Sequence, residues 1–125
     1  NLTDRVQFLK NVPIEDIPSI YRQAEIFIFP SEFEGFGIPI LEALHSQIPV
    51  IAAKGSCLEE AGGPGSLYIN PHDHRELAVT INSLLKNPHE KESMIAMGKE
   101  YVKKFSDDIV AGKLIELYQK LTINA

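Results

Sequence analysis

The chain has 125 residues and a mass of 13.9 kDa, enough for one domain or part of one. Hydrophobic residues make up 44% of it and charged residues 23%, which is an ordinary globular composition, and no stretch has the pattern of a membrane span or a signal peptide. The 12 basic and 17 acidic residues give a net charge of −5, which argues against a nucleic-acid-binding surface. The single cysteine, Cys57, excludes an internal disulfide framework, and we expect a reducing cytoplasm.

Short apolar runs alternate with helical patterns in the first half of the chain. Four runs predict strands, at residues 6–9, 26–29, 50–53 and 67–69. Helices are expected at residues 14–23 and 39–46, with a single helical turn at 58–61. Because the second and third runs are continuously apolar, both faces of these strands should be covered, as in a parallel sheet. We therefore predict an α/β fold with a parallel, Rossmann-like sheet and flanking helices.

The remainder of the chain is predicted to be a helical C-terminal tail. Asp73 and Glu76 form a capping box, Asn87 with Pro88 opens a second helix, and Ser106 caps a third. This last helix carries an apolar stripe formed by Val110, Leu114, Leu117 and Leu121. The spacing predicts that the stripe packs against the chain's own domain, with a surface for a partner as the alternative.

Residues 30–43 carry the most chemical information, because they follow a buried strand and open a helix. Ligands of open α/β sheets bind at the carboxyl ends of the strands. Gly35 and Gly37 allow the backbone to bend tightly and to approach a ligand closely. We expect the amide groups of residues 37–40 to face outward at the helix N-terminus, where they would favour a phosphate.

Two carboxylates flank this expected anion site. Glu34 lies in the loop, and Glu42 lies one turn into the helix, with its side chain leaning back toward the N-terminus. A carboxylate is a poor phosphate ligand but a good acceptor for sugar hydroxyls, at about 1.5–3 kcal/mol for each charged hydrogen bond. The pattern suggests a nucleotide sugar, although a Gly-rich loop alone is a weak signal and Glu42 alone is more simply an exposed helix residue.

The stretch from Glu34 to Glu42 has the form E-x7-E and resembles the retaining glycosyltransferases of family 4, the group 1 glycosyltransferases with a GT-B fold. Further blocks resemble the family in the family's order: Arg5-Val-Gln-Phe-Leu, Ile20-Tyr-Arg-Gln-Ala-Glu25, Pro30-Ser31, Ile48-Pro-Val-Ile-Ala-Ala53, Leu58-Glu-Glu-Ala-Gly-Gly63, Asn70-Pro71 and Phe105-Ser106. The resemblance covers nearly all of the chain. It implies that residues 1–125 are part of a C-terminal donor-binding domain, without its first two β-α units, their Arg/Lys pair and the N-terminal acceptor domain.

The resemblance also implies roles for individual residues. Glu34 would be the catalytic-site acid that binds hydroxyls of the donor sugar, and Glu42 would bind the ribose hydroxyls. The backbone that meets the diphosphate and the donor sugar would be that of Gly35, Phe36, Gly37 and Ile38. The loop near the base would be formed by Lys10, Asn11 and Val12. Two positions depart from the family: Lys10 and Gln47 stand where many members have Gly, and a non-Gly residue in a left-handed helix cap costs about 1 kcal/mol.

The implied reaction is retaining transfer of a hexose, with a lean toward mannose, from a nucleoside diphosphate sugar to a glycan or lipid-linked acceptor. The family needs no cofactor or essential metal, since the leaving phosphate is thought to help deprotonate the acceptor. The acceptor would be bound by the missing N-terminal domain, and no nucleic acid is expected as a partner. Polysaccharide biosynthesis in the cytoplasm, at the periphery of the inner face of the membrane, is the implied setting. The isolated chain is expected to be inactive.

Two other functions are weighed against this one. A non-catalytic nucleotide-sugar-binding or assembly module of the same fold stays open as the alternative. A receiver-type signalling domain is a distant third, because the strands end at Pro30-Ser31 and Ala53-Lys54 instead of the acids that hold Mg²⁺. For a partial donor domain, the strands at 6–9 and 26–29 would each keep an unpaired edge, which we expect to be repaired by self-association or by their pairing with one another.

Overall fold

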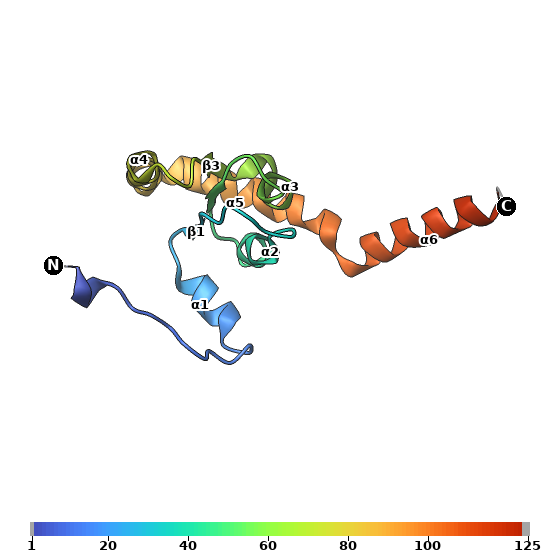
Figure 1. Ribbon diagram of the computed structural model, residues 1–125, viewed down its shortest axis with the longest axis horizontal. Coiled ribbons are helices and arrows are strands. Elements are labelled where there is room, and N and C mark those ends of the chain that lie inside the picture. The colour runs from blue at the N-terminus through green and yellow to red at the C-terminus, as the bar shows by residue number, and fades with distance from the viewer. Residues whose placement is uncertain (1, 124–125) are drawn as a thin grey trace.

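The computed structural model describes residues 2–123, which form a three-stranded parallel sheet with helices against it and a helical C-terminal region (Figure 1). The strands are β1 (Phe27–Phe29), β2 (Val50–Ala53) and β3 (Leu67–Ile69), and their order in the sheet is β1-β2-β3. In the register, Ile28 lies opposite Ile51, and Ala53 lies opposite Ile69. Each connection between neighbouring strands contains a helix, as parallel pairing requires. The predicted α/β class with a parallel sheet is confirmed.

The helices begin and end close to the predicted positions. They are α1 (Ile17–Gln23), α2 (Ile38–His45), α3 (Leu58–Gly62), α4 (His74–Lys86), α5 (Pro88–Val102) and α6 (Asp107–Ile123), with 3-10 turns η1 (Thr3–Arg5), η2 (Gly63–Gly65) and η3 (Lys103–Phe105). The Asp73 carboxylate accepts the backbone N–H groups of Arg75 and Glu76, so it caps α4 as predicted. The Glu76 carboxylate accepts instead from the N–H of Asn70, at 2.7 Å, so the reciprocal half of the capping box is not formed.

Strand β2 is buried along its whole length and divides the core into two layers. Val50 and Ala52 face one layer, which α2 and α3 complete with Ile40, Leu44, Leu58 and Ala61. Ile51 faces the other layer, which includes Leu84 of α4 and Met94 of α5. Successive side chains of a strand point to opposite faces, so a run without polar residues fits only a strand covered twice.

The strand predicted at residues 6–9 is not formed, and this prediction is wrong. The backbone is extended at Val6, but the side chains are largely exposed, with Phe8 at 84%. Among the described residues no strand lies beside this segment, and a strand without a hydrogen-bonded neighbour is not stable in water. Residues 2–13 instead form an arm that runs outside the body of the molecule, and α1 follows it (Figure 1).

The apolar stripe of α6 does not pack against the rest of the described chain, contrary to the prediction. Helix α6 extends away from the sheet and its helices (Figure 1). The stripe residues are about half exposed: Val110, Leu114, Leu117 and Leu121. Helical spacing identifies an apolar face, but it does not identify what covers that face, so the amphipathic pattern alone pointed to the wrong neighbour.

Helix α2 ends in a Schellman motif with a left-handed residue that is not glycine. The N–H of Gln47 donates to Leu44 O at 3.0 Å, and the N–H of Ile48 donates to Ala43 O at 3.1 Å. Gln47 has φ 62°, as the resemblance implied for this position. Its Cβ lies close to the following carbonyl in this conformation, so the cap carries a strain that glycine would not have.

We expect Gln47→Gly to raise the free energy of unfolding by about 0.5–1 kcal/mol, because it removes the left-handed strain. Gln47→Ala is the matched control, since it shortens the side chain but keeps Cβ and therefore the strain. Denaturant unfolding of the three proteins measures the difference. Equal midpoints for the Gly and Ala variants would contradict this account of the cap.

Candidate functional site

The loop between β1 and α2 lies at the carboxyl end of the sheet and is shaped by Gly37. This residue has φ 102° and caps α2 at its N-terminus. A Cβ at this position would lie 2.7 Å from Leu58 Cδ2 of α3, well inside contact distance. Glycine is therefore required twice here, for the backbone conformation and for the close approach of α3. The N-terminus of α2 is held at a fixed position against the core.

Four consecutive backbone N–H groups at the start of α2 have no acceptor among the described residues: those of Gly35, Phe36, Gly37 and Ile38. The sequence predicted outward-facing amides at residues 37–40, and the structure shifts that set by two positions. Pro39 has no N–H, and the N–H of Ile40 already donates to Gly37 O at 2.9 Å. The free donors lie at the positive end of the helix dipole, where an anion is favoured.

Glu34 is half-buried and is held from two sides. The Ser31 hydroxyl donates to its Oε1 at 2.9 Å, and the Cys57 thiol donates to its backbone carbonyl at 3.2 Å. Ser31 lies just after β1 and Cys57 directly before α3, so the loops that follow β1 and β2 meet at this residue. The carboxylate keeps acceptor capacity for a ligand hydroxyl beside the four free amides.

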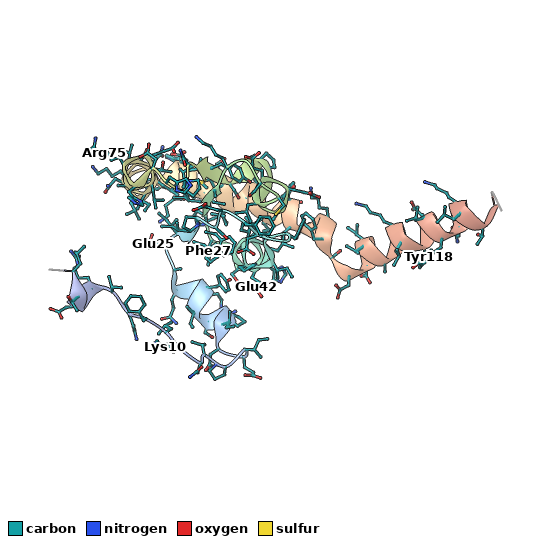
Figure 2. All side chains as sticks on the ribbon, in the orientation of Figure 1. Lys10, Glu25, Phe27, Glu42, Arg75 and Tyr118 are labelled. Atoms are coloured by element: carbon teal, nitrogen blue, oxygen red, sulfur yellow. The ribbon has the colours of Figure 1, made fainter. Side chains whose placement is uncertain are left out.

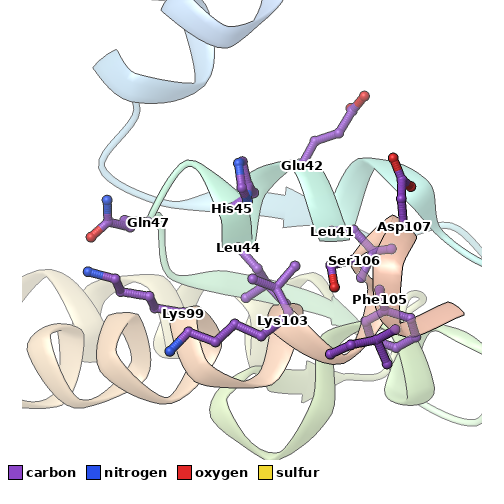
Figure 3. A pocket seen from close by; sticks show the side chains of 12 residues that line it. Leu41, Glu42, Leu44, His45, Gln47, Lys99, Lys103, Phe105, Ser106 and Asp107 are labelled. Carbon is purple, nitrogen blue, oxygen red and sulfur yellow. The ribbon is translucent and has the colours of Figure 1, made fainter. Parts of the chain in front are cut away.

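Glu42 is exposed on α2 (Figure 2), and its carboxylate points away from Lys99 and Lys103 (Figure 3). Its Oε2 accepts a hydrogen bond of 3.0 Å from the Tyr21 hydroxyl of α1. Burial, together with the hydrogen bond and the negative charge of Glu42, raises the pKa of Tyr21 to about 12. The Tyr21 hydroxyl therefore keeps its proton at neutral pH and stays a donor.

The other residues assigned to the site have different surroundings. The Phe36 ring packs against the first core layer and meets Phe105 edge-on at 5.5 Å between ring centroids, whereas Phe33 is 93% exposed and does not pack. The loop of Lys10, Asn11 and Val12 lies on the N-terminal arm (Figure 2). Within residues 2–123 no hydrogen bond or ion pair joins this loop to residues 34–42. Residues 34–38 thus lie at the N-terminal end of α2 with Glu42 one turn further along the helix, and no such contact ties residues 10–12 to them.

Two hollows open on either side of Glu42. One, of about 460 Å³, lies between α1 and α2 and is lined in part by Ile17, Tyr21 and Glu42. The other, of about 830 Å³, lies between α2 and the junction of α5 with α6, and its lining includes Leu44 and Phe105 (Figure 3). Neither is lined by Glu34 or by residues 35–38, so the four free amides lie outside both hollows, on a part of the surface that we call the ledge at the start of α2.

Three contacts of this site were not identified from the sequence. Ser31 stands three residues before Glu34, and this local S-x-x-E spacing could have indicated their hydrogen bond. Tyr21 and Cys57 are distant in sequence from their partners, and no spacing rule joins them.

In residues 2–123 no three His, Cys, Asp or Glu side chains converge as a metal site would need. His72, which forms an H-x-H pattern with His74, has its Nε2 atom 3.4 Å from a carboxylate oxygen of Glu32. No helix in that range has the length and hydropathy to cross a membrane.

Comparison with known proteins places this geometry in a family. The family model described as glycosyl transferases group 1 matches residues 1–101. The chain is 34% identical over 116 residues to O-antigen chain mannosyltransferase B from Escherichia coli, which covers 93% of the chain and 30% of that protein. It is also 34% identical over 107 residues to O-antigen chain mannosyltransferase RfbU from Salmonella typhimurium, covering 86% of the chain and 29% of that protein. The chain spans about three tenths of the length of these relatives.

Solved structures agree with this assignment. Sucrose-phosphate synthase from Thermosynechococcus elongatus superposes with a TM-score of 0.86 at 29% identity, over 99% of the chain and 32% of that structure. The C-terminal domain of a glycosyl transferase group 1 family protein from Francisella tularensis superposes with a TM-score of 0.67 at 27% identity, over 79% of the chain and 51% of that structure. The resemblance to this family is confirmed, and the chain belongs to the group 1 glycosyltransferases.

Proposed function

We propose that the chain is the donor-binding part of a retaining glycosyltransferase, which transfers a hexose from a nucleoside diphosphate sugar to a glycan or lipid-linked acceptor. It would belong to a C-terminal nucleotide-sugar-binding domain, and the acceptor would bind to a separate N-terminal domain of the complete protein. The observation that carries this proposal is the ledge at the start of α2, where four free backbone N–H groups stand between Glu34 and Glu42 in the sequence.

The groups on and beside the ledge match the groups of a nucleotide sugar: donors for the diphosphate and acceptors for the sugar hydroxyls. The amides of residues 35–38 would hold the diphosphate, because N–H groups at a helix N-terminus bind phosphate. Gly35 supports close approach, since a Cβ there would meet open space and no packing requirement explains the glycine. Glu34 would accept hydroxyls of the donor sugar, and Glu42 would accept ribose hydroxyls. In this proposal no metal ion or cofactor is assigned to the site.

The proposed reaction exchanges one bond at the anomeric carbon for another on the same face. The bond from the anomeric carbon to the diphosphate oxygen breaks, a bond to the acceptor oxygen forms, and the acceptor proton passes to the leaving diphosphate. Two relatives named as O-antigen chain mannosyltransferases support mannose as the hexose and polysaccharide biosynthesis as the setting. We place the complete protein in the cytoplasm, peripheral to the inner face of the membrane, and the unpaired Cys57 thiol is compatible with a reducing compartment.

In the complete protein, Glu42→Ala should weaken binding of the donor, and Glu34→Ala should mainly lower turnover. Removing a charged acceptor from sugar hydroxyls costs about 1.5–3 kcal/mol, or roughly ten- to hundredfold. Calorimetric donor binding and steady-state kinetics measure the two effects separately. Glu92→Ala is the matched control, because Glu92 is an exposed helical carboxylate of α5 that lies outside the site. Unchanged donor affinity and unchanged turnover in both site variants would contradict the assignment of these two acids.

We expect the isolated chain to show no measurable transfer. Stabilisation of developing charge is usually the largest catalytic contribution, and the resemblance implies that the Arg/Lys pair and the acceptor domain lie outside this chain. The measurement is release of nucleoside diphosphate from GDP-mannose or UDP-glucose with added acceptors. Turnover above that of a Glu34→Ala, Glu42→Ala double variant would refute this expectation.

We further propose that the isolated chain self-associates through β1. Phe27 directs its N–H to Pro49 O at 2.9 Å, on the β2 side, so the alternation of a parallel ladder directs the N–H and C=O of Ile28 to the opposite edge. In the described sheet no strand covers that edge, and residues 6–9 do not pair with it. An uncharged β-branched and aromatic edge is a template for pairing with another chain.

Light scattering across a dilution series tests this second proposal. A dimer that dissociates on dilution is the expected result, because edge pairing buries only a short strand. The complete protein provides the comparison, since there the additional β-α units would cover the edge. A compact monomer of the isolated chain at every concentration would reject pairing through β1.

A further inference from the structure

The Tyr21 side chain connects α1, the sheet and α2. Its ring is half-buried against the first core layer, with the ring centroid 5.3 Å from that of Phe27 in β1. Its hydroxyl lies 3.0 Å from Glu42 Oε2 and 3.3 Å from the carbonyl oxygen of Pro39, both on α2. A tyrosine hydroxyl has one proton, and the carboxylate is the nearer and stronger acceptor. The position of this donor is therefore set by core packing, not by solvent.

Glu42 depends on this one contact for its orientation. Its carboxylate is exposed, and no other hydrogen bond or ion pair to its side chain exists among residues 2–123. A glutamate on a helix surface otherwise samples several rotamers, and that freedom is lost when a ligand binds. Because Tyr21 occupies Oε2 only, Oε1 keeps its full acceptor capacity. The hydrogen bond therefore lowers the cost of ordering the carboxylate and leaves one oxygen for a ligand.

We propose that Tyr21 is a positioning residue that orients the Glu42 carboxylate so that Oε1 accepts the ribose hydroxyls of the nucleotide. This inference rests on the proposed function, which assigns the ribose contact to Glu42. Tyr21 does not touch the ligand in this arrangement and acts only through Glu42. The raised pKa of the Tyr21 hydroxyl supports the same role, because the group stays protonated at neutral pH and well above it.

A double-mutant cycle in the complete protein tests the inference. The variants are Tyr21→Phe, Glu42→Ala and the double variant, and the probes are GDP and UDP, of which the tighter binder is carried through the series by calorimetry. Tyr21→Phe keeps the ring and its packing and removes only the hydroxyl. It should weaken binding about three- to tenfold, as expected for one hydrogen bond, and should raise the KM for the donor with little change in kcat. In the Glu42→Ala background it should weaken binding no further.

The 2′,3′-dideoxy analogue of the same nucleotide distinguishes the positioning role from a merely structural one, because it lacks the ribose hydroxyls that Glu42 would bind. If Tyr21 acts through the ribose contact, Tyr21→Phe leaves the affinity for this analogue unchanged. Tyr68→Phe is the matched control, because the Tyr68 hydroxyl is also half-buried but donates to Gly63 O at 2.7 Å, away from α2. Both variants should show a similar loss in thermal stability, whereas only Tyr21→Phe should weaken nucleotide binding.

The possible failures are distinguishable. If neither nucleotide binds, or if Glu42→Ala leaves nucleotide affinity unchanged, the proposed function fails at this residue and the inference falls with it. If Glu42→Ala weakens binding but Tyr21→Phe does not, the positioning role is overturned and the ribose contact stands. The positioning role is likewise overturned if Tyr21→Phe weakens binding equally with and without Glu42, or equally for the dideoxy analogue.

Discussion

The burial of β2 on both faces is the constraint on which the rest of the structure depends. Residues 50–53 have no exposed side chain, so helices must cover the strand from both sides. Helices α2 and α3 cover one side of the sheet, and β1 and β3 are the two parallel neighbours of β2. Parallel strands end at the same edge, and the loops that follow β1 and β2 are thereby brought together. The contact of Cys57 with the backbone of Glu34 joins these two loops directly.

The ledge at the start of α2 follows from the same packing. Gly37 fits against Leu58 only because it has no side chain, and this close approach fixes the direction in which α2 leaves the loop. The free amides before α2 and the backbone of Glu42 one turn into it then keep a constant relation to each other. Rigid elements hold binding groups more precisely than loops do, and here the loop is held in place because it packs against α3.

The sequence predicts those parts of the fold that are determined locally. Strands 50–53 and 67–69 have the predicted bounds, since their apolar runs end at charged or turn-forming residues. Residues 6–9 have the same local character, but a strand also needs a neighbour, which no local pattern can supply. The prediction that the α6 stripe packs against the domain fails for the same reason, because a local pattern does not identify the element that covers an apolar face. The free amides lie at residues 35–38 and not at the expected residues 37–40. Pro39 has no N–H, which was already visible in the sequence. The hydrogen bond between Tyr21 and Glu42 spans 21 residues and two helices, and therefore required the structure.

The exposed N-terminal arm affects where proteases can cleave the chain. A protease of trypsin-like specificity cleaves next to a basic residue in extended backbone that is free of helix and sheet hydrogen bonds. Lys10 lies in such a segment, exposed and outside every helix and strand, whereas Lys91 and Lys99 lie within α5. Cleavage at Lys10 would cut into the residues assigned to the base loop without entering the core that holds Glu34 and Glu42.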